Sequence, residues 1–295
     1  AAIVRAYHLI SSPEELERLL LKAEAEGGII AFDVETTSLS ELDSRILGFS
    51  FSWQEGVSYY CALTHQGAAL LDEGRVKQIL ASFLESGRVA LVGQNIKFDY
   101  KVLHYWGIDA KRLLFDTMIA AWLLDSASVF NLDYLAEKYL EHTTVRYSDI
   151  VGKGETLDDL PLSEVVAYGA EDADVTWRLY HLFDELLKAR SLDRLMAEVE
   201  MPLLLVIAKM EIEGIFLDTN LIKPLAVEFE SRIEAIKAQI FSIVGHELNL
   251  NSPKQLQEVL FVEREIPTGA KTRTGFSTAT EVHEPLRDTY PEVDL

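Results

Sequence analysis

The amino-acid sequence predicts an α/β fold in which a mixed β-sheet is flanked by helices. Apolar segments of strand length occur at 28–33, 46–51, 57–63 and 89–93, and segments with helical periodicity lie before and between them. The second and third segments are joined by a short turn around Gly56, which indicates an antiparallel pair. The order of the segments therefore predicts a sheet that begins with an antiparallel meander and continues through helical connections.

Caps and periodicity locate the helices. Ser12 before Pro13, followed by two acids, begins a helix whose amphipathic pattern runs to about Ala25. The segment 146–154 has no clear period, and its glycines make it either a mobile surface loop or a plain connector. Further helices are expected over about 70–86, 116–124, 132–140 and 163–188.

A second region is expected to begin near residue 191. Its predicted elements are, in order, a long helix ending at Gly214, a short strand at 215–218, a helix over 220–244, a capped helix over 253–265 and a polar, loop-like tail from 267. The chain is therefore divided into domains 1–190 and 191–295. The opening Ala1-Ala2 is typical of an internal boundary, and both a natural and a cut end at Leu295 remain open.

Composition limits the classes of protein and partner. Hydrophobic residues make up 48% of the chain and charged residues 25%, as in ordinary globular proteins, and no apolar run approaches the roughly 18 residues of a membrane span. The single cysteine, Cys61, excludes an internal disulfide and a cysteine-rich zinc site, and indicates a reducing compartment such as the cytoplasm. The net charge of −21 argues against a basic face for nucleic-acid phosphates.

Candidate catalytic carboxylates occur in three short patterns. Asp33 and Glu35 end the first strand two residues apart, so both side chains can reach one cation from the same face of the sheet. Asp99 follows Asn95 by four residues, just after the fourth strand. Taken alone, this second pattern favours an ordinary helix start, with Asn95 as the N-cap and an acid in the first turn.

The third pattern lies in the long late helix. Tyr168 and Asp172 are four residues apart and share a face, although a buried tyrosine beside a surface acid would look the same. Glu171 and Asp174 fall on other faces and are expected to be solvated. Small residues beside Tyr168 would let this helix approach the sheet closely; they are Gly169, Ala170 and Ala173.

Taken in order, the three patterns resemble the DEDD exonucleases, with D-x-E on a first strand, N-x-x-x-D after a later strand and Y-x-x-x-D on a late helix. The surrounding strings are similar to the proofreading domain of the family A DNA polymerases, the bacterial DNA polymerase I family. The segments that carry this resemblance are 32–39, 93–99, 115–118 and 168–176. Segments 198–215 and 249–278 resemble the junction and the thumb of the same family, whereas its polymerase active-site motifs are absent from this sequence.

The resemblance implies a ribonuclease H-like 3′–5′ exonuclease fold followed by a mostly α-helical partial thumb. It also implies two divalent cations, Mg²⁺ or Mn²⁺, held by Asp33, Glu35, Asp99 and Asp172. Tyr168, together with Glu35, would orient the attacking water. Ala167 stands where the other branch of the superfamily has a histidine, so the resemblance is to the tyrosine branch.

Substrate and partners follow from the same resemblance. The expected substrate is the 3′ end of single-stranded or frayed DNA, from which nucleoside monophosphates are removed in proofreading, and the rest of a polymerase chain is an expected partner. No membrane partner and a nucleoid-associated, cytoplasmic location are expected. The residues implied to contact the terminal nucleotides are Leu39, Gln94, Asn95 and Tyr147.

Electrostatics supports a metal site if the four carboxylates meet. Two carboxylates 4 Å apart repel by about 4 kcal/mol at an effective dielectric constant of 20, so gathering four of them requires cations. Oxygen ligands suit Mg²⁺ or Mn²⁺.

Two other functions share parts of this pattern. One is an RNA-trimming exonuclease of the ribonuclease D type, which the thumb-like residues 249–278 argue against. The other is a catalytically silent module that only scaffolds a polymerase, which the presence of all four carboxylates argues against.

Overall fold

The computed structural model describes residues 5–267, 271–272, 275–277, 284–290 and 293. The chain divides into two compact units, Ala1–Gly214 and Ile215–Leu295. Within the described residues, no helix combines the length and the apolar character needed to cross a membrane.

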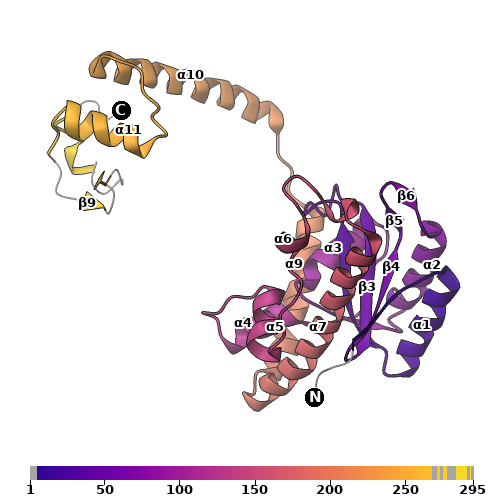
Figure 1. Ribbon diagram of the computed structural model, residues 1–295. Coiled ribbons are helices and arrows are strands. Elements are labelled where there is room, and N and C mark those ends of the chain that lie inside the picture. Colours follow the sequence, from indigo (N-terminus) through magenta and orange to yellow (C-terminus); the bar gives the residue numbers. More distant parts are fainter. Residues whose placement is uncertain (1–4, 268–270, 273–274, 278–283, 291–292, 294–295) are drawn as a thin grey trace. The chain divides into compact units, whose positions relative to one another are not determined.

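A six-stranded mixed sheet forms the centre of the first unit (Figure 1). Strand β2 is central, pairing antiparallel with β3 and parallel with β7, and β3 pairs antiparallel with β4. The outer strands β1 and β8 pair parallel with β4 and β7. In sheet order, the strands are β1 (Ala6–Leu9), β4 (Val57–Ala62), β3 (Ile46–Gln54), β2 (Ile29–Thr36), β7 (Ala90–Gly93) and β8 (Leu113–Asp116).

Helices cover both faces of the sheet. On one face, α1 (Pro13–Ala25) and α2 (Glu73–Leu84) pack against each other and over apolar strand residues such as Phe32 and Phe51, which are almost fully buried. The long helix α7 (Leu162–Ala189) crosses the other face, where it contacts five of the strands (Figure 1). Because successive strand residues point to opposite faces, the polar and apolar residues of β2 separate between these two layers.

The remaining helices of this unit surround α7 and the edge of the sheet. Helices α4 (Thr117–Leu124) and α5 (Leu132–Leu140) pack on α7, and α3 (Ile96–Tyr105) packs against α9 (Met201–Glu213). Between α7 and α9 lie α8 (Asp193–Leu195) and the π-helical turn η2 (Met196–Glu200).

The second unit is built mainly from helices. Helix α10 (Thr219–Val244) is followed by α11 (Pro253–Gln257), which continues as the π-helical segment η3 (Glu258–Glu263). A small cluster of Leu260, Phe261 and Ile266 is buried here. The unit also contains a two-stranded pair, β9 (Lys271–Thr272) and β10 (Gly275–Phe276), and the short helix η4 (Glu284–Leu286).

The four predicted strands and the main helices are confirmed, and several local predictions are wrong. The segment 215–218 is not a strand, and the tail from 267 contains the β9–β10 pair instead of only loop. The segment 146–154 begins with a helical turn, α6 (Tyr147–Ile150). The strands that the sequence did not predict are β1, β8 and the hairpin of β5 (Thr64–His65) and β6 (Ala68–Ala69). Part of the thumb-like string, residues 273–274 and 278, lies outside the described residues.

The missed strands share a cause, because strands of two to four residues are too short to show the alternation that identifies a strand. Helix α9 belongs to the compact first unit, which runs to Gly214.

Candidate active site

Strand β2 delivers the first two carboxylates. Phe32 and Val34 are buried in the core, and the alternation of the strand directs Asp33 and Glu35 to the opposite face, beneath α7. Because β2 is flanked by strands on both sides, these two side chains lie on a rigid, central part of the sheet.

Helix α3 delivers Asp99. The side chain is only 2% exposed, and its Oδ1 accepts a hydrogen bond of 2.9 Å from the backbone N–H of Val34, between the two carboxylates of β2. One oxygen of Asp99 is thus committed to fixing the position of α3 beside the strand.

Helix α7 delivers Tyr168 and Asp172, and Gly169 lets it come close. A Cβ at Gly169 would lie 2.7 Å from a ring carbon of Tyr60 and 3.4 Å from Oε1 of Glu35. On the sheet, Gly48 pairs with Glu35, and a Cβ there would lie 2.6 Å from the Tyr60 hydroxyl. The Tyr60 ring therefore fills the space between two glycines at the edge of the carboxylate cluster.

The carboxylates of Asp33, Glu35 and Asp172 converge. Each offers an oxygen, and the three oxygens lie within 4.8 Å of one another. Asp99 is outside this group of three, but it is close enough for its charge to act on Glu35 and for the charge of Asp33 to act on Asp99. The structure thus brings Asp33, Glu35 and Asp172 together and places Asp99 beside them.

Burial and mutual repulsion raise the pKa of every carboxyl in this group. Burial raises the pKa of Asp33 to about 7. For Glu35, Asp99 and Asp172, burial holds the pKa well above its ordinary range, and the charges of neighbouring carboxylates raise it further. A divalent cation would remove this penalty, and an all-oxygen set of donors fits Mg²⁺ or Mn²⁺.

The tyrosine beside the cluster, Tyr168, remains protonated. Burial, followed by the charges of Asp172 and Glu35, raises the pKa of Tyr168. Its hydroxyl can therefore donate a hydrogen bond at neutral pH but cannot act as a base there. Tyr147 lies next to it, with the two ring centroids 6.4 Å apart in an edge-to-face arrangement.

The other predicted substrate contacts differ in their availability. Leu39 is 90% exposed in the loop between β2 and β3. Gln94 is engaged within the protein: its amide oxygen accepts from Thr117 Oγ1 at 2.5 Å and its amide nitrogen donates to the Phe130 carbonyl at 2.6 Å. Asn95 is exposed and adopts a left-handed conformation at φ 58°, and its side chain makes no capping hydrogen bond.

Asp116 is a positioning residue that the sequence did not single out. It is fully buried, and its carboxylate accepts backbone hydrogen bonds from Asn95 and Ile96 at the start of α3 and from Met118 and Ile119 at the start of α4. Burial raises its pKa to about 6, although these bonds oppose the rise. The sequence signals for it are its place before a helix, as a capping acid, and the resemblance of segment 115–118 to the polymerase family.

Glu171 and Asp174 are corrected from solvated to buried. Glu171 accepts hydrogen bonds from the Val145 backbone at 2.7 Å and contacts His142 at 3.0 Å. Asp174 has no exposed surface and accepts from the Gly56 backbone at 2.6 Å and from the Tyr7 hydroxyl at 3.0 Å. Both residues therefore attach α7 to other segments of the chain. These segments cover the faces of α7 that the sequence analysis expected to be exposed to solvent.

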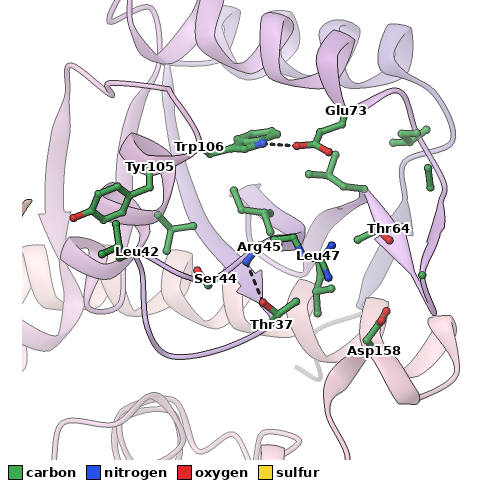
Figure 2. Close-up of a pocket in the computed structure, with 16 residues that line it drawn as sticks. Thr37, Leu42, Ser44, Arg45, Leu47, Thr64, Glu73, Tyr105, Trp106 and Asp158 are labelled. Carbon is green, nitrogen blue, oxygen red and sulfur yellow. Dashed lines mark hydrogen bonds between the residues drawn. The ribbon is translucent and has the colours of Figure 1, made fainter.

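A cavity of about 370 Å³ lies beside the loop that carries Leu39. Its lining begins at Thr37, two residues after Glu35, and includes Leu42 and Tyr105 on one side and Thr64 and Asp158 on the other (Figure 2). The loop residues 37–45 therefore have open space on one side.

Comparison with known proteins yields two family matches. A model described as 3′–5′ exonuclease matches residues 7–188, and a model described as DNA polymerase family A matches residues 219–295. DNA polymerase I of Borreliella burgdorferi is 36% identical over 288 residues, which are 98% of this chain and 31% of that protein. DNA polymerase I of Pseudomonas aeruginosa is 37% identical over 271 residues, 88% of this chain and 30% of that protein.

A solved structure supports the fold. The polymerase domain of Pol1 from M. smegmatis, in complex with DNA primer-template and dNTP, superposes with a TM-score of 0.75 at 24% identity, covering 97% of this chain and 46% of that chain. The chain spans about a third of the length of the curated relatives it matches.

Proposed function

We propose that the chain removes nucleoside monophosphates from DNA 3′ ends by metal-dependent hydrolysis. The premise is that it belongs to the 3′–5′ exonuclease family of the family A DNA polymerases. The observation that carries this proposal is the convergence of three carboxylate oxygens within 4.8 Å, beside a protonated tyrosine. The biological role that fits is proofreading.

The metal ligands in this proposal are the four carboxylates. Asp33, Glu35 and Asp172, together with the neighbouring Asp99, would hold two divalent cations. Such a pair of ions activates a water molecule and stabilises charge on the attacking and leaving oxygens. Mg²⁺ or Mn²⁺ is the proposed metal.

The protein groups orient the reacting water. The Tyr168 hydroxyl, which stays protonated, would donate a hydrogen bond to the oxygen of this water, and a carboxylate oxygen of Glu35 would accept one of its protons in a hydrogen bond. Leu39, Asn95 and Tyr147 are proposed to contact the terminal nucleotides. Gln94 would contribute mainly by supporting the adjacent segment, since its amide already has two protein partners.

The proposed partners follow from this activity. The substrate would be a single-stranded or frayed DNA 3′ end, held by metals, stacking and polar contacts, which is compatible with the net charge of −21. Residues 1–190 would supply the exonuclease, and 191–295 the junction and partial thumb of a polymerase chain. We also propose a cytoplasmic, nucleoid-associated location.

Substitution of the carboxylates tests the proposal. Asp33→Asn and Asp172→Asn should abolish Mg²⁺-dependent release of nucleoside monophosphates from a 5′-labelled single-stranded oligodeoxynucleotide. Glu164→Gln, an exposed acid on the same helix α7, is the matched control and should retain full activity. Unchanged hydrolysis by both Asn variants would exclude this site as the catalytic one.

Two measurements separate the alternatives. Equal or faster cleavage of an RNA oligonucleotide would favour an RNA-trimming enzyme. Failure of Mn²⁺ to bind the wild-type protein, measured by calorimetry with Asp33→Asn as the reference, would favour a catalytically silent module.

A further inference from the structure

The loop between β2 and β3, residues 37–45, is shaped mainly by hydrogen bonds within itself. Its ends are joined by hydrogen bonds of 3.0 Å from the Thr37 N–H to the Arg45 carbonyl and from the Arg45 N–H to Thr37 Oγ1. Its tip is closed by the Ser44 N–H, which donates to the Ser40 carbonyl at 2.9 Å. These bonds fix the shape of the loop, and they do not fix where its tip lies.

Apolar packing does little to hold the tip. Leu39 and Leu42 are 90% and 67% exposed, and the 370 Å³ cavity lies on the side of the loop that faces Tyr105 and Trp106 (Figure 2). A loop with few buried apolar contacts has low local stability unless polar contacts tie it down.

A single lysine supplies such a tie. Lys101 Nζ lies 2.7 Å from Glu41 Oε1 in the loop and 2.6 Å from Glu211 Oε2 on α9, and its side chain is only 11% exposed. Ion pairs between fully solvated groups contribute little, whereas a largely buried ammonium between two carboxylates is screened much less. Without it, Glu41 and Glu211 would repel each other.

We propose that Lys101 is a positioning residue that holds the 37–45 loop, and with it Leu39, at a fixed place beside the carboxylate cluster. Lys101 belongs to α3, whose Asp99 is hydrogen-bonded to β2, so the loop is tied to the same helix that lines the cluster. The role in substrate binding rests on the proposed exonuclease function, while the tie itself does not.

Lys97 provides a matched control. It lies one helical turn earlier on α3 and pairs with the other oxygen of Glu211, at 2.6 Å, without reaching the loop. Lys97→Met therefore removes one α3–α9 ion pair and the same charge as Lys101→Met, but it leaves the Glu41 contact in place.

Steady-state kinetics on a single-stranded oligodeoxynucleotide tests the proposal. Lys101→Met should raise KM about tenfold, because the loop must then be ordered at the moment of binding, and should change kcat by less than about twofold. Glu41→Gln removes the same Lys101–Glu41 pair without leaving two carboxylates to repel each other, so it should also raise KM, and the double variant should be no worse than Lys101→Met alone. Lys97→Met should leave KM within about twofold of wild type.

A mobility measurement is independent of activity. Cys61 is fully buried, so a nitroxide attached to Leu39→Cys reports selectively on the loop. The spectrum should show faster motion in the Lys101→Met background and no change in the Lys97→Met background. Equal KM values for Lys101→Met and wild type, or equal effects of the two lysine substitutions, would overturn the proposal.

The same experiments separate the proposed exonuclease function from the positioning role of Lys101. If the wild-type chain hydrolyses no oligonucleotide in Mg²⁺, the proposed function fails, and the nitroxide spectra still decide whether Lys101 holds the loop. If hydrolysis is normal and the loop motion is unchanged in Lys101→Met, only the positioning role fails.

Discussion

At the scale of single residues, the candidate site consists of carboxylates that are costly to bury and that lie at positions where the fold buries them. Asp33 and Glu35 lie on one face of β2, which pairs with β3 at both positions, and Asp172 is brought to them by a helix with its own core face. The raised pKa values of these carboxyls express this cost. Metal binding is the process that would relieve it.

The stability of the metal-free protein should fall as pH rises. The pKa of Asp33 is about 7 in the folded chain, against an ordinary value of 3.8, so between these values the folded state holds a proton that the unfolded state releases. The contribution of Asp33 to the free energy of unfolding is therefore complete below about pH 4 and is lost as the pH rises through about 7. Over this range the free energy of unfolding falls by up to about 1.4 kcal/mol per pH unit. The raised pKa values of its neighbours act in the same direction.

Thermal unfolding in EDTA from pH 5 to pH 8 measures this slope. The midpoint should fall with pH in the wild type, fall less in Asp33→Asn, and rise again when Mg²⁺ is added at pH 8. A midpoint that increases from pH 5 to pH 8 in EDTA would contradict the clustering of these carboxyls.

At the scale of elements, the site depends on how closely and at what angle α3, α4 and α7 meet the sheet. Gly169 and Gly48 allow the Tyr60 ring to lie between α7 and β3. Asp116 joins the starts of α3 and α4 through four backbone hydrogen bonds. Both features set the positions of the predicted catalytic residues, although none of the residues in these two features is itself predicted to be catalytic.

Gly169→Ala should destabilise the fold although alanine favours helix. Its Cβ would lie 2.7 Å from Tyr60, whose ring is 1% exposed and has no room to move, so overpacking should cost about 1–3 kcal/mol. Guanidinium unfolding measures the change, and the same substitution in a Tyr60→Leu background should cost less. Equal stability of Gly169→Ala and wild type would mean that α7 is not held this closely.

Asp116→Ala should cost about 3 kcal/mol, because it leaves several buried backbone N–H groups without an acceptor. Asp72 is the control: it caps α2 through one hydrogen bond to the Arg75 N–H, so Asp72→Ala should cost about 1 kcal/mol. Chemical denaturation of both variants gives the comparison. Similar losses for the two aspartates would show that Asp116 is only an ordinary helix cap.

At the scale of the whole molecule, the compact first unit runs to Gly214. Met196, Met201 and Leu204 belong to the main core, and they come from the segment that follows residue 190. The match to the exonuclease family ends at 188, so the unit that folds together is longer than the unit that matches.

Two truncated chains test this difference. Residues 1–214 should unfold cooperatively, whereas residues 1–190 should be less stable by about 5 kcal/mol, because three large apolar side chains leave the core. Chemical denaturation of the two fragments measures the difference. Equal stability would favour residue 190 as the structural boundary.

The sequence alone determined the central strands and the main helices, and its motifs resemble the exonuclease family to which the chain belongs. The elements depend on local order: strand alternation places Asp33 with Glu35 on one face, and the helical repeat places Tyr168 with Asp172. The predicted ribonuclease H-like α/β fold with a helical region after it is confirmed for this reason.

Only the tertiary structure decided which polar groups are enclosed and what they hold. Glu171 and Asp174 were predicted to be solvated and are buried, and Asp116 and Lys101 each join segments that are far apart in the chain. Such contacts depend on how the elements pack, and no periodicity within a single helix or strand encodes them.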